Sequence, residues 1–265
     1  MIIESLHIYP VKALAGISLQ EAEVTPRGLK YDRRFMLVTD DDRFITQRTH
    51  PQLTQFGVEI MGNDLMISHP ESGRVQTSLT PASEPSGRAT VWNDEVLVSK
   101  VRKEVDRFFS KALGESIRMV GMPDCSVRQV DLQYGEPGEL VSFADGYPVL
   151  VLGRASIEEL NTRLDNPVPI KRFRANIIVS GSGAWEEDSW KEVSAERVVL
   201  KMAKQCARCI VIRTDQQTGE RSDEPMTTLL TYRRFDKKVM VGMNAIPDRG
   251  SEGLVLKVGQ TIAAN

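Results

Sequence analysis

Apolar and polar residues alternate with a period of two along much of the chain, a pattern typical of half-buried β-strands. The first such stretch covers residues 1–9 and ends at Pro10, because proline cannot donate a hydrogen bond to a sheet. Further strands are predicted at residues 17–24, 31–38, 56–61, 65–69, 74–79, 89–98 and 117–120. Turn-forming residues separate them, so the first half of the chain is predicted to form a small barrel or sandwich.

Helical spacing of apolar residues first appears near residue 100. It places Val101, Val105, Phe108, Phe109 and Ala112 on one face of a helix, with Gly114 as a suitable C-cap. A capping box at residues 156–159 predicts a second helix, and Asp223 is predicted to cap a short third one. The remaining strands are predicted at residues 149–152, 171–180, 198–202, 210–214, 236–245 and 254–258, after a long loop at 122–139. We therefore predict an α+β fold that is mostly β, divided into residues 1–118 and 119–265.

Composition excludes several classes of protein. The chain has 265 residues, enough for one large or two ordinary domains, and 41% of them are hydrophobic. A net charge of −2 gives no strong attraction to nucleic acid or to an anionic membrane. No apolar run approaches the ~20 residues of a membrane span, and the N-terminus lacks the pattern of a signal peptide. Three cysteines, an odd number, argue against a disulfide scaffold, so a reducing, cytoplasmic location is predicted.

Two of the three cysteines, Cys206 and Cys209, lie close together with Arg208 between them. Residues 198–202 before them alternate, and residues 210–214 after them are mostly β-branched, so the cysteines are predicted in or beside a turn between two strands. A thiol held at a strand end beside a cation has a lowered pKa and can serve as a soft metal ligand.

This Cys-x-x-Cys pattern has four interpretations. Zinc needs about four ligands, and the other candidates are isolated in the sequence: Cys125, His7, His50 and His69. A redox disulfide prefers the start of a helix, whereas strand-forming residues follow here. The cysteines could also be inert core residues. The fourth interpretation is a single thiolate bound to a larger cofactor, and the basic residues favour it.

Basic residues recur at predicted strand ends. Lys12 follows the first strand, although a lone loop lysine is usually solvated. Arg172, Arg174 and Asn176 would share one face of an extended strand, where either an anion or solvent could meet them. If Lys12, Arg34, Arg174 and Arg208 converge in the fold, they would bind a phosphorylated, polyanionic cofactor. A molybdenum ion held by an anionic dithiolene ligand would satisfy both the cations and the thiolate.

An ordered set of short motifs runs through the whole chain. It comprises Tyr9-Pro-Val-Lys12, Gly28-Leu, Asp32-Arg-Arg34-Phe, Phe173-Arg-Ala-Asn176-Ile, Glu187-Asp-Ser-Trp190, Cys206-Ala-Arg-Cys209, residues 215–219, Glu224-Pro and residues 229–233. With this set the chain resembles the MOSC superfamily, the C-terminal domain of molybdenum cofactor sulfurases, preceded by its N-terminal β-barrel companion. Within the superfamily it is most similar to the mitochondrial amidoxime-reducing components and their bacterial relatives. The resemblance implies a β-barrel-like domain followed by a MOSC β-barrel with a few short helices.

The resemblance also implies roles for individual residues. Cys209 would be the molybdenum ligand, with Asp145 beside the metal as a second catalytic residue. The residues that would hold the pterin and its phosphate are Lys12, Ala13, Arg34, Arg174, Asn176, Ala207 and Arg208. Some relatives have serine in place of Ala13, so one phosphate contact is expected to be missing. Relatives also often carry cysteine in place of Ser182.

The implied reaction is the reduction of N-hydroxylated small molecules by oxygen transfer to the molybdenum cofactor. Because no four-cysteine cluster motif is present, the electrons must come from a separate ferredoxin- or cytochrome b5-like protein. Neither nucleic acid nor a membrane is an expected partner. Two alternatives remain: a non-redox carrier that uses the same cysteine for sulfur or cofactor, and a binding module that uses the basic face for a nucleotide or an acidic partner.

Overall fold

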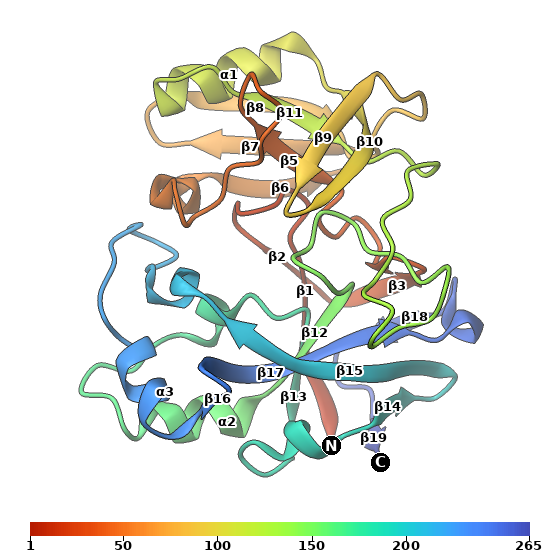
Figure 1. Ribbon diagram of the computed structural model, residues 1–265, viewed down its shortest axis with the longest axis vertical. Coiled ribbons are helices and arrows are strands. Elements are labelled where there is room, and N and C mark those ends of the chain that lie inside the picture. The colour runs from red at the N-terminus through yellow and green to blue at the C-terminus, as the bar shows by residue number, and fades with distance from the viewer.

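The computed structural model describes residues 1–265 and is built around a nine-stranded sheet (Figure 1). Its hydrogen-bonded order is β19-β14-β15-β17-β12-β13-β1-β2, with β16 attached to β17. The strand bounds are β1 Ile2–Ile8, β2 Ile17–Leu19, β12 Val149–Gly153, β13 Ile177–Ser180, β14 Glu192–Ala195, β15 Val198–Arg208, β16 Arg234–Phe235, β17 Lys238–Pro247 and β19 Ala263–Ala264. Only β12 and β13 are parallel, and every other pair is antiparallel.

Three smaller sheets complete the fold. One has the order β5-β11-β10-β9, another β6-β7-β8, and the third β18-β3-β4. Their bounds are β3 Glu21–Thr25, β4 Gly28–Leu29, β5 Phe35–Val38, β6 Gly57–Met61, β7 Asp64–His69, β8 Gly73–Ser78, β9 Gly87–Val91, β10 Asp94–Lys100, β11 Arg118–Gly121 and β18 Val255–Lys257. Strands contain 39% of the residues, so the predicted mostly β fold is confirmed.

Helices are short and few. They are α1 Lys103–Leu113, α2 Arg154–Asn161 and α3 Met226–Tyr232, with 3-10 turns η1 Pro51–Gln55, η2 Ile170–Phe173, η3 Glu186–Ser189, η4 Ile210–Arg213 and η5 Arg249–Ser251. Helix α1 buries Val105, Phe108 and Phe109 and ends at Gly114 in the left-handed conformation, as its pattern predicts. No helix combines the length and the apolarity that crossing a bilayer requires.

The first strands belong to both halves of the molecule. Strands β1 and β2 lie in the nine-stranded sheet, where β1 pairs with β13, whereas β11 pairs with β5 and β10 of the N-terminal sheets. Figure 1 shows β5–β11 and α1 gathered above the large sheet, with β1 passing down into it. Because β1 lies in the large sheet and β5–β11 do not, the chain that leaves β1 at Tyr9 crosses between the two halves and carries Lys12 to their junction. The division between residues 118 and 119 stays a prediction.

Two predicted strands next to the basic residues and cysteines were wrong. Residues 171–180 form the 3-10 turn η2, then Arg174 with φ 53°, and only then β13. Residues 210–214 form the 3-10 turn η4 rather than a strand, despite their β-branched side chains. Only Ile212 of that turn is buried, so packing at one position outweighs the local strand preference.

Three further boundaries also differ from the prediction. Residues 89–98 form a hairpin rather than one strand, because the chain turns at Trp92 with φ 57°. The strand predicted at residues 31–38 begins only at Phe35. Helix α2 begins at Arg154, so Ser156 does not cap it; its hydroxyl donates instead to the buried Glu187 at 2.7 Å.

Gly28 is expected to be intolerant of a side chain, because it combines a φ of +95° with close packing. A Cβ at this position would lie 2.4 Å from the carbonyl oxygen of Pro148, the residue that leads into β12. We expect Gly28→Ala to lower the free energy of unfolding by roughly 2–4 kcal/mol through strain and overlap together. Gly73→Ala is the matched control, since Gly73 has φ +85° but nothing within 4 Å of the added Cβ. Urea unfolding that gave equal losses for both variants would contradict the overlap.

Candidate functional site

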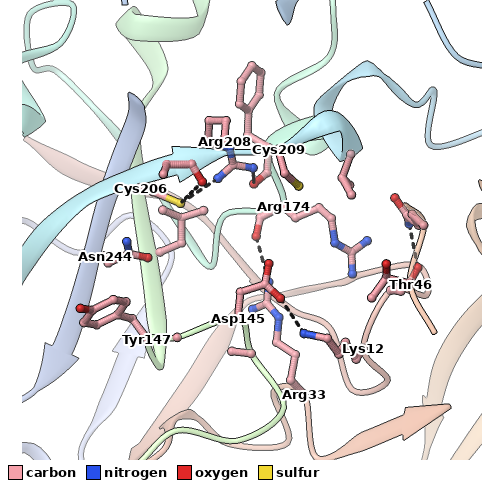
Figure 2. A pocket seen from close by; sticks show the side chains of 18 of the residues that line it. Lys12, Arg33, Thr46, Asp145, Tyr147, Arg174, Cys206, Arg208, Cys209 and Asn244 are labelled. Carbon is pink, nitrogen blue, oxygen red and sulfur yellow. Dashed lines mark hydrogen bonds and ion pairs between the residues drawn. The ribbon is translucent and has the colours of Figure 1, made fainter. Parts of the chain in front are cut away.

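A cavity of about 340 Å³ lies where the turn after β1, the loop before β12 and the end of β15 meet (Figure 2). The residues that line it are Lys12, Ala13, Arg33, Thr46, Gln47, Arg48, Ala144, Asp145, Gly146, Tyr147, Leu150, Phe173, Arg174, Asn176, Lys204, Cys206, Ala207, Arg208, Cys209, Val211 and Asn244. Eight of the nine predicted site residues are among them, and Arg34 is the exception. We call this cavity the central pocket.

The two cysteines lie along one side of the central pocket. Cys206 is part of β15, and Cys209 follows the last residue of that strand in an extended conformation. Arg208 donates from Nη1 to Cys206 Sγ at 3.2 Å and from Nη2 to the Phe173 carbonyl at 2.7 Å. Its Nε is buried without a partner, and the Cys209 thiol has no hydrogen-bond partner within the chain. The guanidinium is therefore held in place by two of its five N–H donors, and its buried Nε–H is left without an acceptor.

Lys12 and Asp145 form an ion pair in the pocket. Lys12 Nζ lies 2.6 Å from Asp145 Oδ1 and donates to the Phe143 carbonyl at 2.7 Å, while Arg48 reaches the other carboxylate oxygen at 3.4 Å. Burial lowers the pKa of Lys12, whose side chain is only 6% exposed. Desolvation acts to raise the pKa of Asp145. The charge and hydrogen bond of Lys12, together with the charges of Arg48 and Arg33, outweigh it and hold that pKa well below its usual range. Asp145 is thus an ionised hydrogen-bond acceptor at neutral pH.

Arg33 and Arg174 both stack on the buried ring of Tyr9. Their guanidinium carbons lie 4.4 and 4.2 Å from its centroid, within the range of a cation–π contact. Arg33 also donates to Asp32 at 2.6 Å and to Asn176 Oδ1 at 3.1 Å. Arg174 has a single side-chain hydrogen bond, 3.4 Å to Gln216, and burial lowers its pKa to about 10. Its guanidinium is positioned by stacking but is poorly supplied with acceptors.

Three residues of the pocket wall have backbones in the left-handed region. The φ angles are 72° at Ala13, 48° at Arg33 and 53° at Arg174, a conformation that costs energy for any residue but glycine. Neighbouring contacts hold them there; for example, Gln47 donates to the Ala13 carbonyl at 2.7 Å. Backbone strain of this kind is common at functional sites, but it also occurs elsewhere in this chain, for example at Trp185 and Glu196.

Arg34 does not reach the central pocket. It donates to the Met122 carbonyl at 2.5 Å and to Asp124 Oδ1 at 2.7 Å, so it supports the loop after β11. Its neighbour Arg33 takes the place in the pocket that was expected for Arg34. The sequence offered two adjacent arginines without a means of choosing between them.

Other pocket residues were missed, some of them with a usable signal. Period-two alternation places Lys204, Cys206 and Arg208 on one face of a strand, so Lys204 could have been included. Arg48 and Asn244 carried no such signal, because they reach the pocket from a turn and from the next strand, β17. No three His, Cys, Asp or Glu side chains lie together as a set of metal ligands.

Sequence comparisons agree with the two-part architecture. Residues 1–116 match the MOSC N-terminal beta barrel domain, and residues 139–263 match the MOSC domain. Mitochondrial amidoxime-reducing component 1 of Mus musculus is 33% identical, over 88% of this chain and 72% of its own length. Mitochondrial amidoxime reducing component 2 of Rattus norvegicus is 30% identical, over 97% of this chain and 80% of its own.

A longer relative matches with one part of its length. Molybdenum cofactor sulfurase of Oryza sativa subsp. japonica is 28% identical over 91% of this chain, but the match covers only 32% of the sulfurase. The two domain matches, and the similarity to the two amidoxime-reducing components over most of each chain, lead to one assignment. The chain belongs to the MOSC-domain family that includes the mitochondrial amidoxime-reducing components.

Proposed function

We propose that the protein binds a molybdopterin-type molybdenum cofactor in the central pocket and reduces N-hydroxylated compounds with electrons from a separate protein. One observation carries the proposal: a thiol without a partner, Cys209, shares a cavity with six cations and a single carboxylate. The cations are Lys12, Arg33, Arg48, Arg174, Lys204 and Arg208. Such an excess of positive charge favours an anionic ligand, and a thiolate suits a soft metal.

The residues present fit such a cofactor. Arg208 has a buried Nε without an acceptor, and Arg174 has only one long hydrogen bond, so both can still bind phosphate or pterin oxygens. The relatives named amidoxime-reducing components and molybdenum cofactor sulfurase support this choice of ligand. Cys209 would hold the molybdenum. The residues that would hold the organic part are Lys12, Ala13, Arg33, Arg174, Asn176, Ala207 and Arg208.

The chain's own groups would bind and orient the substrate. When bound, the cofactor would supply the two electrons and the oxygen acceptor needed to cleave the N–O bond. The net reaction consumes two electrons and two protons for each N–O bond and releases water. Asp145 stays ionised because Lys12, Arg48 and Arg33 surround it, so it would accept a hydrogen bond from the substrate's amidine N–H rather than donate a proton. A ferredoxin- or cytochrome b5-like protein in the cytoplasm would supply the electrons.

Metal analysis and turnover test this proposal on the holoprotein. We expect about one molybdenum per chain and reduction of benzamidoxime to benzamidine with a chemical electron donor. Protein without molybdenum after expression in a host that makes the cofactor would contradict the binding. Bound molybdenum without reduction of any N-hydroxylated probe would contradict the reductase activity.

A non-redox carrier is the second candidate, and the similarity to a molybdenum cofactor sulfurase favours it. A carrier would hold the cofactor or a sulfur atom at the same cysteine and pass it to another enzyme. Cofactor that transfers to an apo-molybdoenzyme, together with no benzamidoxime turnover, would establish this function in place of the reductase.

A further inference from the structure

Lys204 differs from the other cations of the central pocket. Each of the other five donates a hydrogen bond to an acceptor in the chain: Lys12, Arg33, Arg48, Arg174 and Arg208. Lys204 Nζ has no acceptor and lies over two aromatic rings, 4.2 Å from the centroid of Tyr134 and 5.2 Å from that of Tyr147. A cation–π contact leaves the N–H donors of an ammonium group available.

Asn244 is the direct neighbour of Lys204 in the sheet. The two residues are paired across β15 and β17, so their side chains stand next to each other on the same face. The amide of Asn244 also has no hydrogen-bond partner within the chain, although it lines the pocket. An ammonium group and an amide N–H₂ with no acceptor thus lie side by side on the pocket wall.

This pair lies away from Lys12 and Arg174, two of the cations assigned to the cofactor (Figure 2). In Figure 2, Asn244, Tyr147 and Cys206 lie on one side of Asp145, whereas Lys12 and Arg174 lie on the other. A phosphate would prefer the arginine-rich side, where guanidinium groups can bind it through two parallel hydrogen bonds. One ammonium and one amide beside each other instead match the two oxygens of a carboxylate.

Resting on the proposed function, we infer that Lys204 and Asn244 bind a carboxylate carried by the N-hydroxylated substrate. The substrate would extend from Asp145, which accepts a hydrogen bond from its N–H group, to this pair at the other side of the pocket. The ring of Tyr147 also lines the pocket beside the ammonium group and adds apolar surface next to an aromatic substrate body. The substrate class is therefore an anionic, carboxylate-bearing N-hydroxylated compound.

Paired probes test this inference on the holoprotein. We expect 4-carboxybenzamidoxime to have a higher kcat/KM than benzamidoxime, and Lys204→Met to lower the ratio of the two values about tenfold, as expected for a lost charged hydrogen bond. Lys204→Glu is expected to reverse the preference toward 4-aminomethylbenzamidoxime. Lys201→Met is the matched control, because Lys201 lies on the same strand outside the pocket and pairs with Asp248 at 3.1 Å. That control should leave both values unchanged.

Calorimetric binding of the same probes and molybdenum content give readouts that need no turnover. The inference is supported if the carboxylated probe binds more tightly than benzamidoxime and if this advantage is lost in Lys204→Met. If such binding is found but no N–O bond is cleaved, the proposed reductase activity is wrong and the inferred carboxylate site stands. Equal affinity of the wild-type protein for both probes would overturn it. Molybdenum content that falls in Lys204→Met but not in Lys201→Met would overturn it too, because Lys204 would then belong to cofactor binding.

Discussion

Cys209→Ala is expected to lose benzamidoxime reduction by at least ~100-fold and to be purified with little or no molybdenum. Cys209 lies at the end of β15 with no competing hydrogen-bond partner, facing a cavity that six cations share. If it is the protein's only bond to the metal, its loss should exceed the ~10–100-fold effects seen when a residue that merely supports a metal ligand is changed. Molybdenum per chain and steady-state reduction, measured on the same preparations, check this expectation.

The other two cysteines provide controls of different kinds. Cys125 is exposed on the loop before β12 and lies outside the pocket, so Cys125→Ala should change neither quantity. Cys206 lines the pocket and accepts a hydrogen bond from Arg208, so Cys206→Ala should keep molybdenum but loosen that guanidinium. Equal molybdenum in Cys209→Ala and the wild-type protein would remove the proposed ligand role of Cys209.

Alternation and helical spacing were sufficient for most of the secondary structure. Strand β7 buries every second residue, as alternation predicts, and β12 is buried throughout, as its unbroken apolar run predicts. In β1 the alternation is interrupted by a register shift between Ile3 and Ser5, so Ile3, Leu6 and Ile8 are the buried residues. Convergence of strand ends on one site was also predictable, because sheets bring their ends together. That reasoning placed Lys12, Arg174 and Cys209 correctly in the central pocket.

Backbone angles at the pocket were not predictable. Arg174 and Asn176 were expected to share a strand face, yet they reach the pocket through a 3-10 turn and a left-handed residue. Positive φ at Tyr31 and Arg33 likewise directs Arg33 inward while Arg34 turns to Asp124. Such angles are imposed by tertiary contacts and leave no trace in hydrophobic periodicity.

Arg33→Met is expected to lower the free energy of unfolding by roughly 3–5 kcal/mol, the cost of leaving a buried charge unpaired. The carboxylate of Asp32 is 1% exposed and would lose its counter-ion while keeping the backbone N–H of Tyr9, at 2.8 Å, as a donor. The exposed pair of Arg88 and Glu95 provides the comparison: Arg88→Met should cost less than about 1 kcal/mol. Urea unfolding measures both.

A second substitution separates charge from packing at the same position. In the double variant Asp32→Asn/Arg33→Met the amide oxygen can still accept from the Tyr9 N–H while no charge is buried, so most of the lost stability should return.

The loss of stability in Arg33→Met should also depend on pH, with a defined sign. Burial already raises the pKa of Asp32, and loss of its counter-ion should raise it further, so the folded state of Arg33→Met binds a proton more tightly than the unfolded chain. The free energy of unfolding that Arg33→Met loses relative to the wild-type protein should therefore shrink as the pH falls through the raised folded-state pKa of Asp32 toward its unfolded value. A loss caused by missing packing contacts would not change with pH.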